Sequence, residues 1–398
     1  MKHQGEVKPV KRAKDLYTKL LSDENLALAL DEVNRTHRWR PHHRPNKVVA
    51  WVEANKEQRI KDLRSILIQG FCPAVPTMKR RWDKSAGKWR DIYEPKLWPD
   101  QYIHHAVIQV LQPVMMRGMD RWCCGSIRGR GIHYGQAAIR RWMRDDPKGT
   151  KYCVELDIHH FYESLRPDLV MARLKTLVKD RRFLGVVWAV IKDGILIGAY
   201  FSQWLANTFL QPLDHLIRQG GFGVAHFIRY MDNFTIFGPN KRMLHRLITA
   251  IGNWLGEHGL RIKDNWQLFR TSFTAKVERA HQHLEERKQR HRKPRLPTAL
   301  GYRYGEGYTL LRKRNLFRLK RQLSSYYKRV TRGLTIAITM AQGLLSRLGQ
   351  LKHCNAQHIF ARFVKPKTQR NLKAIVRAYA RKERAKWTTS SAPSPATA

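Results

Sequence analysis

The sequence predicts an α+β protein with a long helical C-terminal part, and two observations support this fold class. Between residues 151 and 300, short apolar runs alternate with segments of helical spacing, as expected when strands and helices share one core. Residues 311–388 keep a helical spacing of apolar side chains. The chain has 398 residues and 42% hydrophobic content, which is enough for two or three packed subdomains.

The charge of the chain indicates a polyanionic partner. It contains 76 Lys and Arg against 31 Asp and Glu, a formal charge of +45, which suits nucleic acid. An anionic membrane is the rival, but no stretch reaches the roughly 20 apolar residues of a spanning helix, and the basic N-terminus lacks a signal-peptide core. We therefore expect a cytoplasmic protein without a membrane partner. The five cysteines lack paired CxxC spacing, which argues against a disulfide framework or a zinc ribbon.

Residues 1–75 are predicted to form an N-terminal helical extension. Leucines recur at helical spacing on both sides of Ser22 and Asp23, which are suited to cap a helix. A loop rich in Arg, His and Pro follows over residues 35–45, and helical spacing resumes over residues 48–69.

The central part of the chain is predicted to mix strands and helices. In residues 76–150, a segment dense in Lys, Arg and Trp (78–95) predicts a basic hairpin, and residues 100–111 carry a helical stripe. Residues 151–270 hold the main α+β pattern. Its expected strands lie within 154–158 and 227–237, and its expected helices lie at 168–178, 202–217 and 244–255.

The C-terminal part is more basic. Residues 271–297 hold eight Lys and Arg with three Glu and are interpreted as a hydrophilic insertion. Residues 298–310 are expected to form a hairpin, and residues 311–388 a basic helical region. The Ser- and Pro-rich residues 389–398 are expected to be disordered.

Two aspartates are the candidates for chemistry. Transfer of a nucleotide requires acidic side chains that hold two Mg²⁺ ions. Asp157 ends the first expected strand, and Asp232 lies at the tip of a hairpin expected within residues 227–237. An isolated Asp in such a place is more often a turn residue, but pairing of these strands would bring both carboxylates together.

The segments around these aspartates resemble the reverse transcriptase family, over residues 75–355 and in the family's order. The resemblance implies a right-hand polymerase with fingers (76–150), a palm that includes part of the fingers (151–270), and a thumb (311–388). The matching positions are Lys88 and Arg90; Asp157, Ile158, Phe161 and Tyr162; Ile197, Gly198, Ser202, Gln203 and Asn207; Tyr230, Met231, Asp232 and Asn233; Lys263; and Leu300, Gly301 and Tyr302.

The resemblance also implies a role for each group. Asp157, Asp232 and the backbone carbonyl of Ile158 would bind two Mg²⁺, with Mn²⁺ as a substitute, and Lys263 would protonate pyrophosphate. The ring of Tyr162 would clash with a 2′-hydroxyl and so favour dNTPs, although a Tyr packed under the strand is the alternative. The remaining positions would contact substrate. These are Lys88, Arg90, Phe161, Ile197, Gly198, Ser202, Gln203, Asn207, Tyr230, Met231 and Asn233, while Leu300, Gly301 and Tyr302 would form the primer grip.

Several of these positions have a structural interpretation as well. Gln203 and Asn207 suit core hydrogen bonding as well as substrate contact. Gly198 is expected to let a base approach the main chain closely. Tyrosines interleaved with Lys and Arg after residue 300 suit a groove for a template–primer duplex, but an amphipathic helix with basic residues on its outer face explains the same pattern.

The segment from Ile197 to Gln203 resembles the reverse transcriptases of diversity-generating retroelements, because Ile replaces the Gln common in other groups. The resemblance implies an enzyme that copies template RNA from a primer with errors at adenines. It also implies a duplex of template with primer or cDNA and a small basic helical oligomeric accessory protein as partners. Because Ile197 lacks the polar group of Gln, we expect the enzyme to select the incoming base less accurately.

Asn233 stands where most of the family has Asp, and it keeps an oxygen ligand while removing a charge beside the metals. We nevertheless expect activity, because Asp157 and Asp232 supply the minimum pair of carboxylates. Three alternatives stay open. They are an abortive-infection or retron-type reverse transcriptase, a catalytically impaired RNA-binding protein, and an RNA-dependent RNA polymerase, against which Tyr162 argues.

Overall fold

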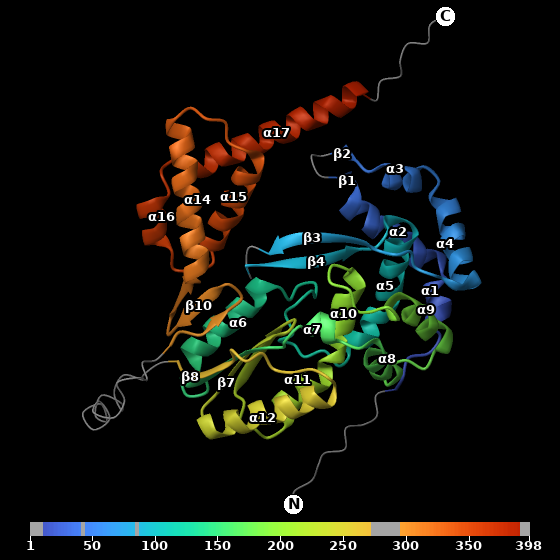
Figure 1. The fold of residues 1–398 in the computed structure, drawn as a ribbon, viewed down its shortest axis with the longest axis horizontal. Helices are drawn as coiled ribbons and strands as arrows, with labels where there is room; N and C mark the ends of the chain where they lie inside the picture. Colours follow the sequence, from blue (N-terminus) through green and yellow to red (C-terminus); the bar gives the residue numbers. More distant parts are fainter. Residues whose placement is uncertain (1–10, 41–43, 84–86, 272–294, 391–398) are drawn as a thin grey trace, which may run out of the picture.

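The computed structural model describes residues 11–40, 44–83, 87–271 and 295–390. Its centre is a four-stranded antiparallel sheet of order β6-β7-β5-β8 (Figure 1). The expected strands are present, and the sheet between helices confirms the α+β prediction. The strands are β5 (Tyr152–Asp157), β6 (His226–Tyr230), β7 (Asn233–Gly238) and β8 (Gln267–Arg270).

The two faces of this sheet pack against different helices, because successive side chains of a strand point to opposite faces. Val154 and Leu156 of β5 belong to the larger core with helix α12. Cys153 lies on the other face, in a second core with Trp142 of helix α6 and with the C-terminal helices. Because side chains alternate along β5, Asp157 points to the same face of the sheet as Cys153. The sequence of β5 therefore places the carboxylate of Asp157 on the face that packs against the second core.

The N-terminal helices form the right-hand side of Figure 1. The Ser22 side chain accepts a hydrogen bond from the Asn25 N–H (3.3 Å), which confirms the expected cap between α1 and α2. Residues 48–69, expected as one helical segment, form two helices separated at Asn55. The elements are α1 (Leu16–Leu20), α2 (Asp23–His37), β1 (Trp39–Arg40), β2 (Arg44–Pro45), α3 (Lys47–Ala54) and α4 (Lys56–Gly70).

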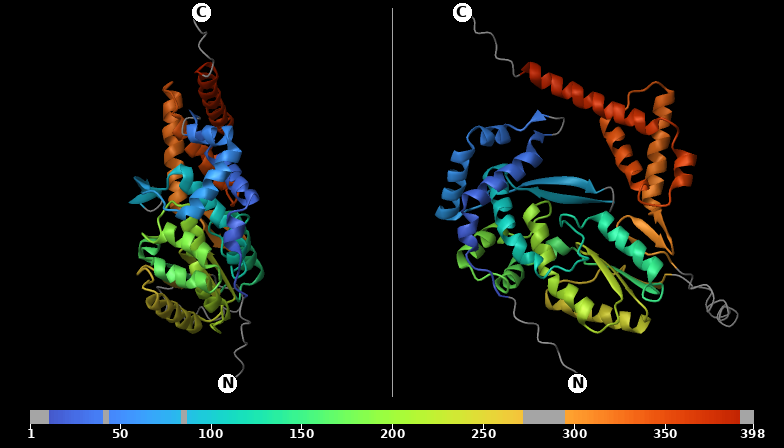
Figure 2. Two further views of the ribbon diagram at one scale, coloured as in Figure 1. Left: turned by 90° about the vertical axis from the view of Figure 1, so that its right-hand side faces the viewer. Right: turned by 180° about the vertical axis from the view of Figure 1, so that it is seen from behind.

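The expected basic hairpin is formed by β3 (Thr77–Asp83) and β4 (Lys88–Glu94), which project toward the C-terminal helices (Figures 1 and 2). The segment expected as one helix over 202–217 is two helices, because the chain breaks at Leu210 and Pro212 starts the second. The remaining elements of this part are η2 (Leu97–Gln101), α5 (Tyr102–Met116), α6 (Ile132–Asp145), α7 (Phe161–Ser164), α8 (Pro167–Lys175), α9 (Arg181–Ile191), α10 (Tyr200–Phe209), α11 (Gln211–Gln219) and α12 (Lys241–Glu257).

The C-terminal part is a three-stranded sheet followed by four helices. Helix α17 continues to Ser390. Residues 389 and 390, which were expected to be disordered, therefore belong to this helix. The rest of that tail, and residues 272–294 of the expected insertion, lie outside the described residues. The elements are β9 (Thr298–Ala299), β10 (Tyr302–Gly305), β11 (Tyr308–Leu311), α14 (Lys313–Thr331), α15 (Ile338–Leu351), α16 (Gln357–Phe363) and α17 (Thr368–Ser390).

Three of the tyrosines expected to face a duplex are core residues instead. Tyr302, Tyr304 and Tyr326 are each at most 3% exposed and pack in the second core. Their rings pack with other large apolar side chains, among them Trp142 and Leu319, where the sheet meets the C-terminal helices. None of the described helices combines the length and the apolarity that crossing a bilayer requires.

Candidate active site

The turn between β6 and β7 brings the two candidate aspartates together. Asp157, the last residue of β5, is paired with Asn233, the first residue of β7. The Ile158 N–H donates to the carbonyl of Asp232 (3.2 Å). Met231 in the same turn has a φ of +58°, a conformation that is strained for a side chain of this size. The surrounding structure therefore holds this turn in place.

Both carboxylates lie in a cleft of about 920 Å³ between the central sheet, the β3–β4 hairpin and the start of α14. Many of the residues expected at the site line this cleft. They are Arg90, Asp157, Ile158, Phe161, Tyr162, Ile197, Tyr230, Asp232, Asn233, Lys263, Leu300 and Gly301. Arg312 and Arg314, which were not expected, add positive charge on the wall at the start of α14.

Lys263 is positioned by backbone pairing beside Asp157. Its N–H donates to the carbonyl of Asp157 (2.8 Å), and Ile262 forms a bridge with Ile158. The Nζ atom lies 3.8 Å from Oδ2 of Asp157. The ammonium group is half exposed, so it can move toward a charged group that enters the cleft.

Asn233 interacts directly with Asp232. The Nδ2 atom of Asn233 donates a hydrogen bond to Oδ1 of Asp232 (3.0 Å). An ionised aspartate at this position could not donate it, because a carboxylate only accepts. Asn233 therefore supplies an uncharged amide that orients the neighbouring carboxylate.

The donor set fits Mg²⁺ with partial protein coordination. Among the described residues, no group of three or more His, Cys, Asp or Glu side chains is arranged to hold a metal ion. Mg²⁺ is usually bound through one or two carboxylates together with waters and substrate phosphates. Asp157 and Asp232 supply two such carboxylates on one side of an open cleft, so the residues present are suited to ions that arrive with a nucleotide.

Tyr162 lies half-buried on α7 at the edge of the cleft. Burial raises the pKa of its phenol, and the nearby carboxylate of Asp232 raises it further. The hydroxyl therefore stays neutral. Phe161 beside it is buried in the larger core, so it supports the floor of the cleft.

Arg90 faces the cleft from β4. Its Nε donates to Oδ2 of Asp83 (2.7 Å), which holds the guanidinium across the hairpin and leaves its other donors for a ligand. The side chain of Lys88 lies outside the described part, so its expected contact with substrate stays a prediction.

The main chain at Gly198 is approached closely by another segment of the protein. This corrects the prediction that a base would lie against Gly198. Gly198 has a φ of +106°, and a Cβ there would lie 2.5 Å from Cγ2 of Ile92 and 3.0 Å from the carbonyl of Tyr93. The Tyr93 N–H also donates to the carbonyl of Ile197 (2.8 Å). The glycine therefore docks the β3–β4 hairpin onto the wall of the cleft. Ser202 is buried and Gln203 half-buried, and neither lines the cleft.

Asn207 is a core residue, which corrects its expected contact with substrate. It is 1% exposed, and its Nδ2 donates to the carbonyl of Gly125 (2.8 Å). Its Oδ1 accepts from Nη1 of Arg229 (2.8 Å). Both ends of the amide are therefore occupied inside the protein.

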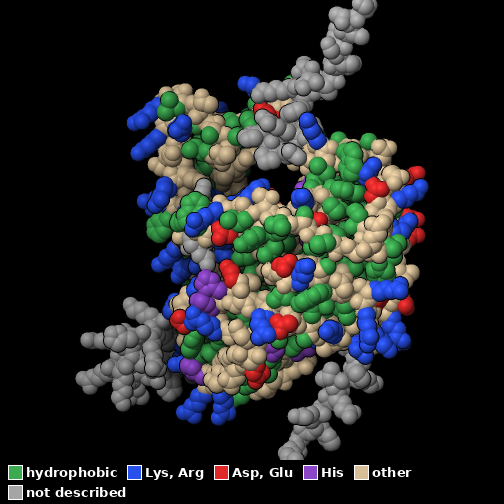
Figure 3. Space-filling view, turned by 45° about the vertical axis from the view of Figure 1, so that its right-hand side comes forward, with side chains coloured by type: hydrophobic (Ala, Val, Ile, Leu, Met, Phe, Trp, Pro, Cys, Tyr) green, Lys and Arg blue, Asp and Glu red, His purple; other side chains and the backbone are tan. Residues whose placement is uncertain are grey.

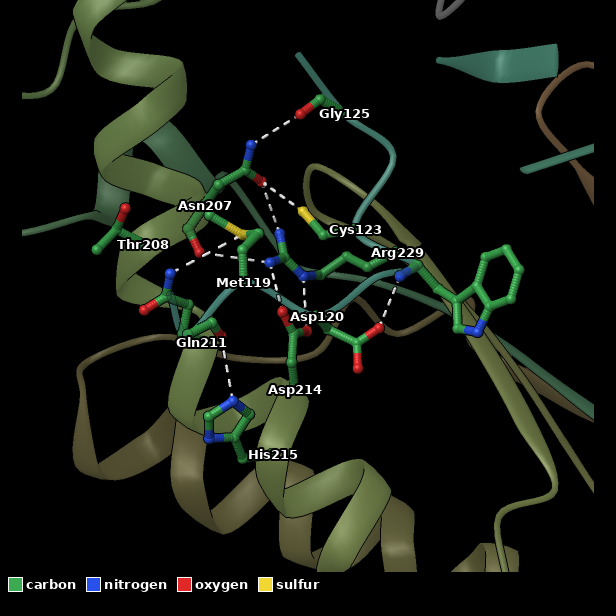
Figure 4. Close-up of polar contacts among 12 residues, drawn as sticks. Met119, Asp120, Cys123, Gly125, Asn207, Thr208, Gln211, Asp214, His215 and Arg229 are labelled. Carbon is green, nitrogen blue, oxygen red and sulfur yellow. Dashed lines mark hydrogen bonds and ion pairs between the residues drawn. The ribbon is translucent and has the colours of Figure 1, made fainter. Parts of the chain in front are cut away.

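Arg229 is the centre of a buried network that the sequence analysis missed (Figure 4). It forms a bidentate pair with Asp214, with distances of 2.7 Å and 2.6 Å. Its Nη1 also donates to the carbonyl of Met231 (3.1 Å) in the turn between β6 and β7. A signal was available in the sequence, because an arginine within the apolar run of β6 needs a buried partner.

The loop before α6 supports the same turn from the other side. The Cys124 N–H donates to the carbonyl of Arg229 (2.8 Å), and the Arg229 N–H donates to the carbonyl of Trp122 (3.1 Å). A Cβ on Gly125 would lie 2.5 Å from the sulfur of Met231. Met231 thus packs against this loop and is absent from the cleft wall, contrary to its expected contact with substrate.

The expected primer-grip residues divide between the cleft and the core. Leu300 and Gly301 form a turn with φ angles of +52° and +87° and line the cleft, whereas Tyr302 is buried. The Thr298 N–H donates to Oε1 of Glu155 on β5. Burial raises the pKa of Glu155, against the effect of that hydrogen bond. The turn is thereby tied to the strand that ends in Asp157.

The chain is similar to several known proteins. The family model described as reverse transcriptase (RNA-dependent DNA polymerase) matches residues 79–278, half of the chain. Protein YkfC of Escherichia coli strain K12 is 21% identical over 183 residues, which are 42% of this chain and 48% of that protein. The chain thus matches about half the length of this curated relative.

Two solved telomerase structures are also similar. One is apo telomerase from Candida tropicalis, truncated from its C-terminal domain, with a TM-score of 0.39 and 14% sequence identity. The match covers 54% of this chain and 55% of the telomerase chain. Telomerase from Candida albicans, in complex with the TWJ fragment of telomeric RNA, has a TM-score of 0.42 and 13% identity and covers 86% and 65%.

Proposed function

The chain belongs to the reverse transcriptase family, and from this premise we propose that it is an RNA-directed DNA polymerase that uses Asp157 and Asp232. The observation that carries the proposal is the register of β5 and β7, which sets both carboxylates at adjacent strand ends in one cleft. The formal charge of +45 supports nucleic acid as the partner.

The reaction follows from the groups in the cleft. The 3′-hydroxyl of a primer would lose its proton to water, and its oxygen would form a bond to the α-phosphorus of a dNTP while the bond from that phosphorus to the bridging oxygen breaks and pyrophosphate leaves. Two Mg²⁺ ions held by Asp157 and Asp232 would activate the attacking oxygen and stabilise the leaving one. Lys263, whose Nζ lies 3.8 Å from Oδ2 of Asp157, would donate a proton to the leaving pyrophosphate.

The other residues of the cleft would select and orient the substrate. Arg90 offers a planar group of donors for phosphate oxygens. Tyr162 presents a neutral ring near Asp232 and would exclude a 2′-hydroxyl. Leu300 and Gly301 would hold the primer end, and template RNA would enter between the β3–β4 hairpin and α14.

We further propose that the enzyme is the error-prone polymerase of a diversity-generating retroelement. Ile197 lines the cleft with an apolar side chain, so selection of the incoming base would depend on shape rather than on a hydrogen bond. A small basic helical oligomeric protein would be its accessory partner, and the enzyme would act in the cytoplasm.

A second candidate is a polymerase-derived RNA-binding protein with impaired catalysis, and Asn233 is the observation that favours it. Replacing Asp157 by Ala separates the two. An enzyme loses its function while RNA binding persists, whereas a binding protein is unaffected.

The proposal is tested by primer extension on a defined RNA template, followed by sequencing of the cDNA. We expect incorporation of dNTPs with Mg²⁺ or Mn²⁺ and errors concentrated opposite adenines. Accurate cDNA would contradict the retroelement assignment and leave the polymerase assignment standing. Absence of cDNA with both metals, from folded protein that still binds RNA, would favour the second candidate.

A further inference from the structure

The C-terminal helices carry an excess of positive charge that the cleft does not use. Residues 312–382 contain 19 Lys and Arg and no Asp or Glu. The cleft takes Arg312 and Arg314 from this region. Most of the remaining cations lie elsewhere on the bundle, and Figure 3 shows Lys and Arg side chains along its outer edge, at the upper left.

Two hollows on this bundle collect many of these cations. One, of about 500 Å³, lies between α14 and α16, and the other, of about 670 Å³, lies between α16 and α17. Each is lined by five Lys or Arg, and they share Lys365. No lining residue of either hollow is acidic, and neither hollow shares a residue with the cleft. We name the two together the outer groove.

Helix α16 lines both hollows of the outer groove. In two opposite views, α16 lies on the side of α14 that is turned away from the β3–β4 hairpin (Figures 1 and 2). A ligand in the outer groove would therefore leave the cleft accessible. Like charges gathered in this way repel one another, so an anionic ligand would stabilise the surface.

Two aromatic rings of the outer groove, those of Phe363 and Tyr327, lie close to lysine ammonium groups. Nζ of Lys320 lies 4.2 Å from the ring centre of Phe363, and Nζ of Lys365 lies 5.1 Å from that of Tyr327. The Tyr327 hydroxyl also accepts from the Lys365 N–H (2.9 Å). These ammonium groups compete with bases for the ring faces, so recognition by the groove would depend mainly on phosphates.

We propose that the outer groove is a second RNA-binding surface, which holds a base-paired segment of RNA by its phosphates while the cleft holds template and primer. The inference rests on the proposed function for its choice of RNA. The cores of protein interfaces are depleted in Lys, whereas Lys- and Arg-rich surfaces are typical of nucleic-acid interfaces. Phosphate recognition without base stacking suits double-stranded RNA.

The test uses the full chain with a short template–primer duplex already bound in excess. A labelled RNA hairpin of roughly 16 base pairs is titrated at several salt concentrations, without metal or nucleotide. One variant replaces four exposed groove cations by Gln (Lys328, Arg332, Arg370 and Lys373). The control replaces four exposed cations of α8, α9 and their connection by Gln (Lys175, Lys179, Arg181 and Arg182).

We expect the hairpin to bind the wild type and the control with the duplex in place. The groove variant should bind it at least tenfold more weakly, with a salt slope reduced by about 3, and should extend the short primer at the wild-type rate. Equal weakening in variant and control, or displacement of the duplex by the hairpin, would overturn the proposal. Unchanged hairpin binding by the groove variant would also overturn it. Binding of the hairpin is measured without catalysis. Failure of this proposal can therefore be distinguished from failure of the polymerase assignment.

Discussion

Arg229 and Asp214 form a bidentate ion pair in which both side chains are 0% exposed. The pair is joined to the turn between β6 and β7, because the same guanidinium donates to the carbonyl of Met231 (3.1 Å). Burial opposes the charge on Arg229, but Asp214 outweighs it and raises the pKa of the guanidinium. The position of Asp232 thus depends on a charge pair in the core.

Breaking this pair should destabilise the protein strongly. Arg229→Met leaves the carboxylate of Asp214 buried without its partner, and the free energy of unfolding should fall by about 3–5 kcal/mol. The double variant Arg229→Met with Asp214→Leu should recover much of that loss, because no unpaired charge remains. Denaturant unfolding of both variants measures this. Equal instability of the single and double variants would contradict it.

The double variant should also distinguish the effect of Arg229 on the position of the β6–β7 turn from its effect on the stability of the protein. It is expected to fold yet to lose most of its rate, because the carbonyl of Met231 no longer receives the donor that fixes the turn. In steady-state kinetics, kcat should fall while KM for dNTP changes little. Full activity in the folded double variant would show that Arg229 serves the core alone.

Gly198→Ala should displace the β3–β4 hairpin, and the chain provides a matched control. Gly194 also has a positive φ, +130°, but a Cβ there meets only Leu196, at 3.9 Å. Both variants place a Cβ at a positive φ, which costs about 1–3 kcal/mol. Only Gly198→Ala adds the clash with Ile92 and Tyr93, worth about 1–3 kcal/mol more. Thermal unfolding and KM for dNTP should change more in Gly198→Ala than in Gly194→Ala, and equal effects would contradict the docking role.

Tyr162→Ala should reduce the discrimination between dNTP and rNTP by about tenfold or more, whereas Tyr162→Phe should keep it. Because burial and Asp232 raise the pKa of the phenol, the neutral form persists as pH rises. Discrimination by the wild type should therefore stay constant between about pH 7 and 9, below the ordinary pKa of tyrosine. Incorporation ratios measured across this range test it, and loss of discrimination toward pH 9 would be the contrary result.

Asn233→Asp should change the dependence on metal. The added carboxylate attracts cations, and a gain of about 1.4 kcal/mol would lower the Mg²⁺ concentration at half-maximal rate roughly tenfold. Asn233→Ala removes the donor to Asp232 without adding charge and should lower the rate. Metal titrations of the two variants provide the measurement. If Asn233→Asp required more Mg²⁺ than the wild type, the prediction would be contradicted. The hydrogen bond from the amide of Asn233 would then contribute more to metal binding than an added negative charge.

The sequence was sufficient to predict the pair of aspartates, because strand periodicity and a hairpin tip are local features. Asn207 and Gly198 show the limit of such prediction. Their true neighbours, Arg229 and the β3–β4 hairpin, are distant along the chain, so the contacts depend on tertiary packing that no local pattern reports. The buried tyrosines of the C-terminal part were misjudged for the same reason, since a basic flanking sequence does not reveal which rings are covered.

The most direct test of the central claim compares wild type with Asp157→Asn and Asp232→Asn in primer extension on an RNA template. Each substitution keeps the size of the side chain and removes one metal-binding charge. We predict incorporation of dNTPs by the wild type, loss of at least a thousandfold in rate in each variant, and unchanged binding of template–primer. Wild-type rates in either variant would contradict the account.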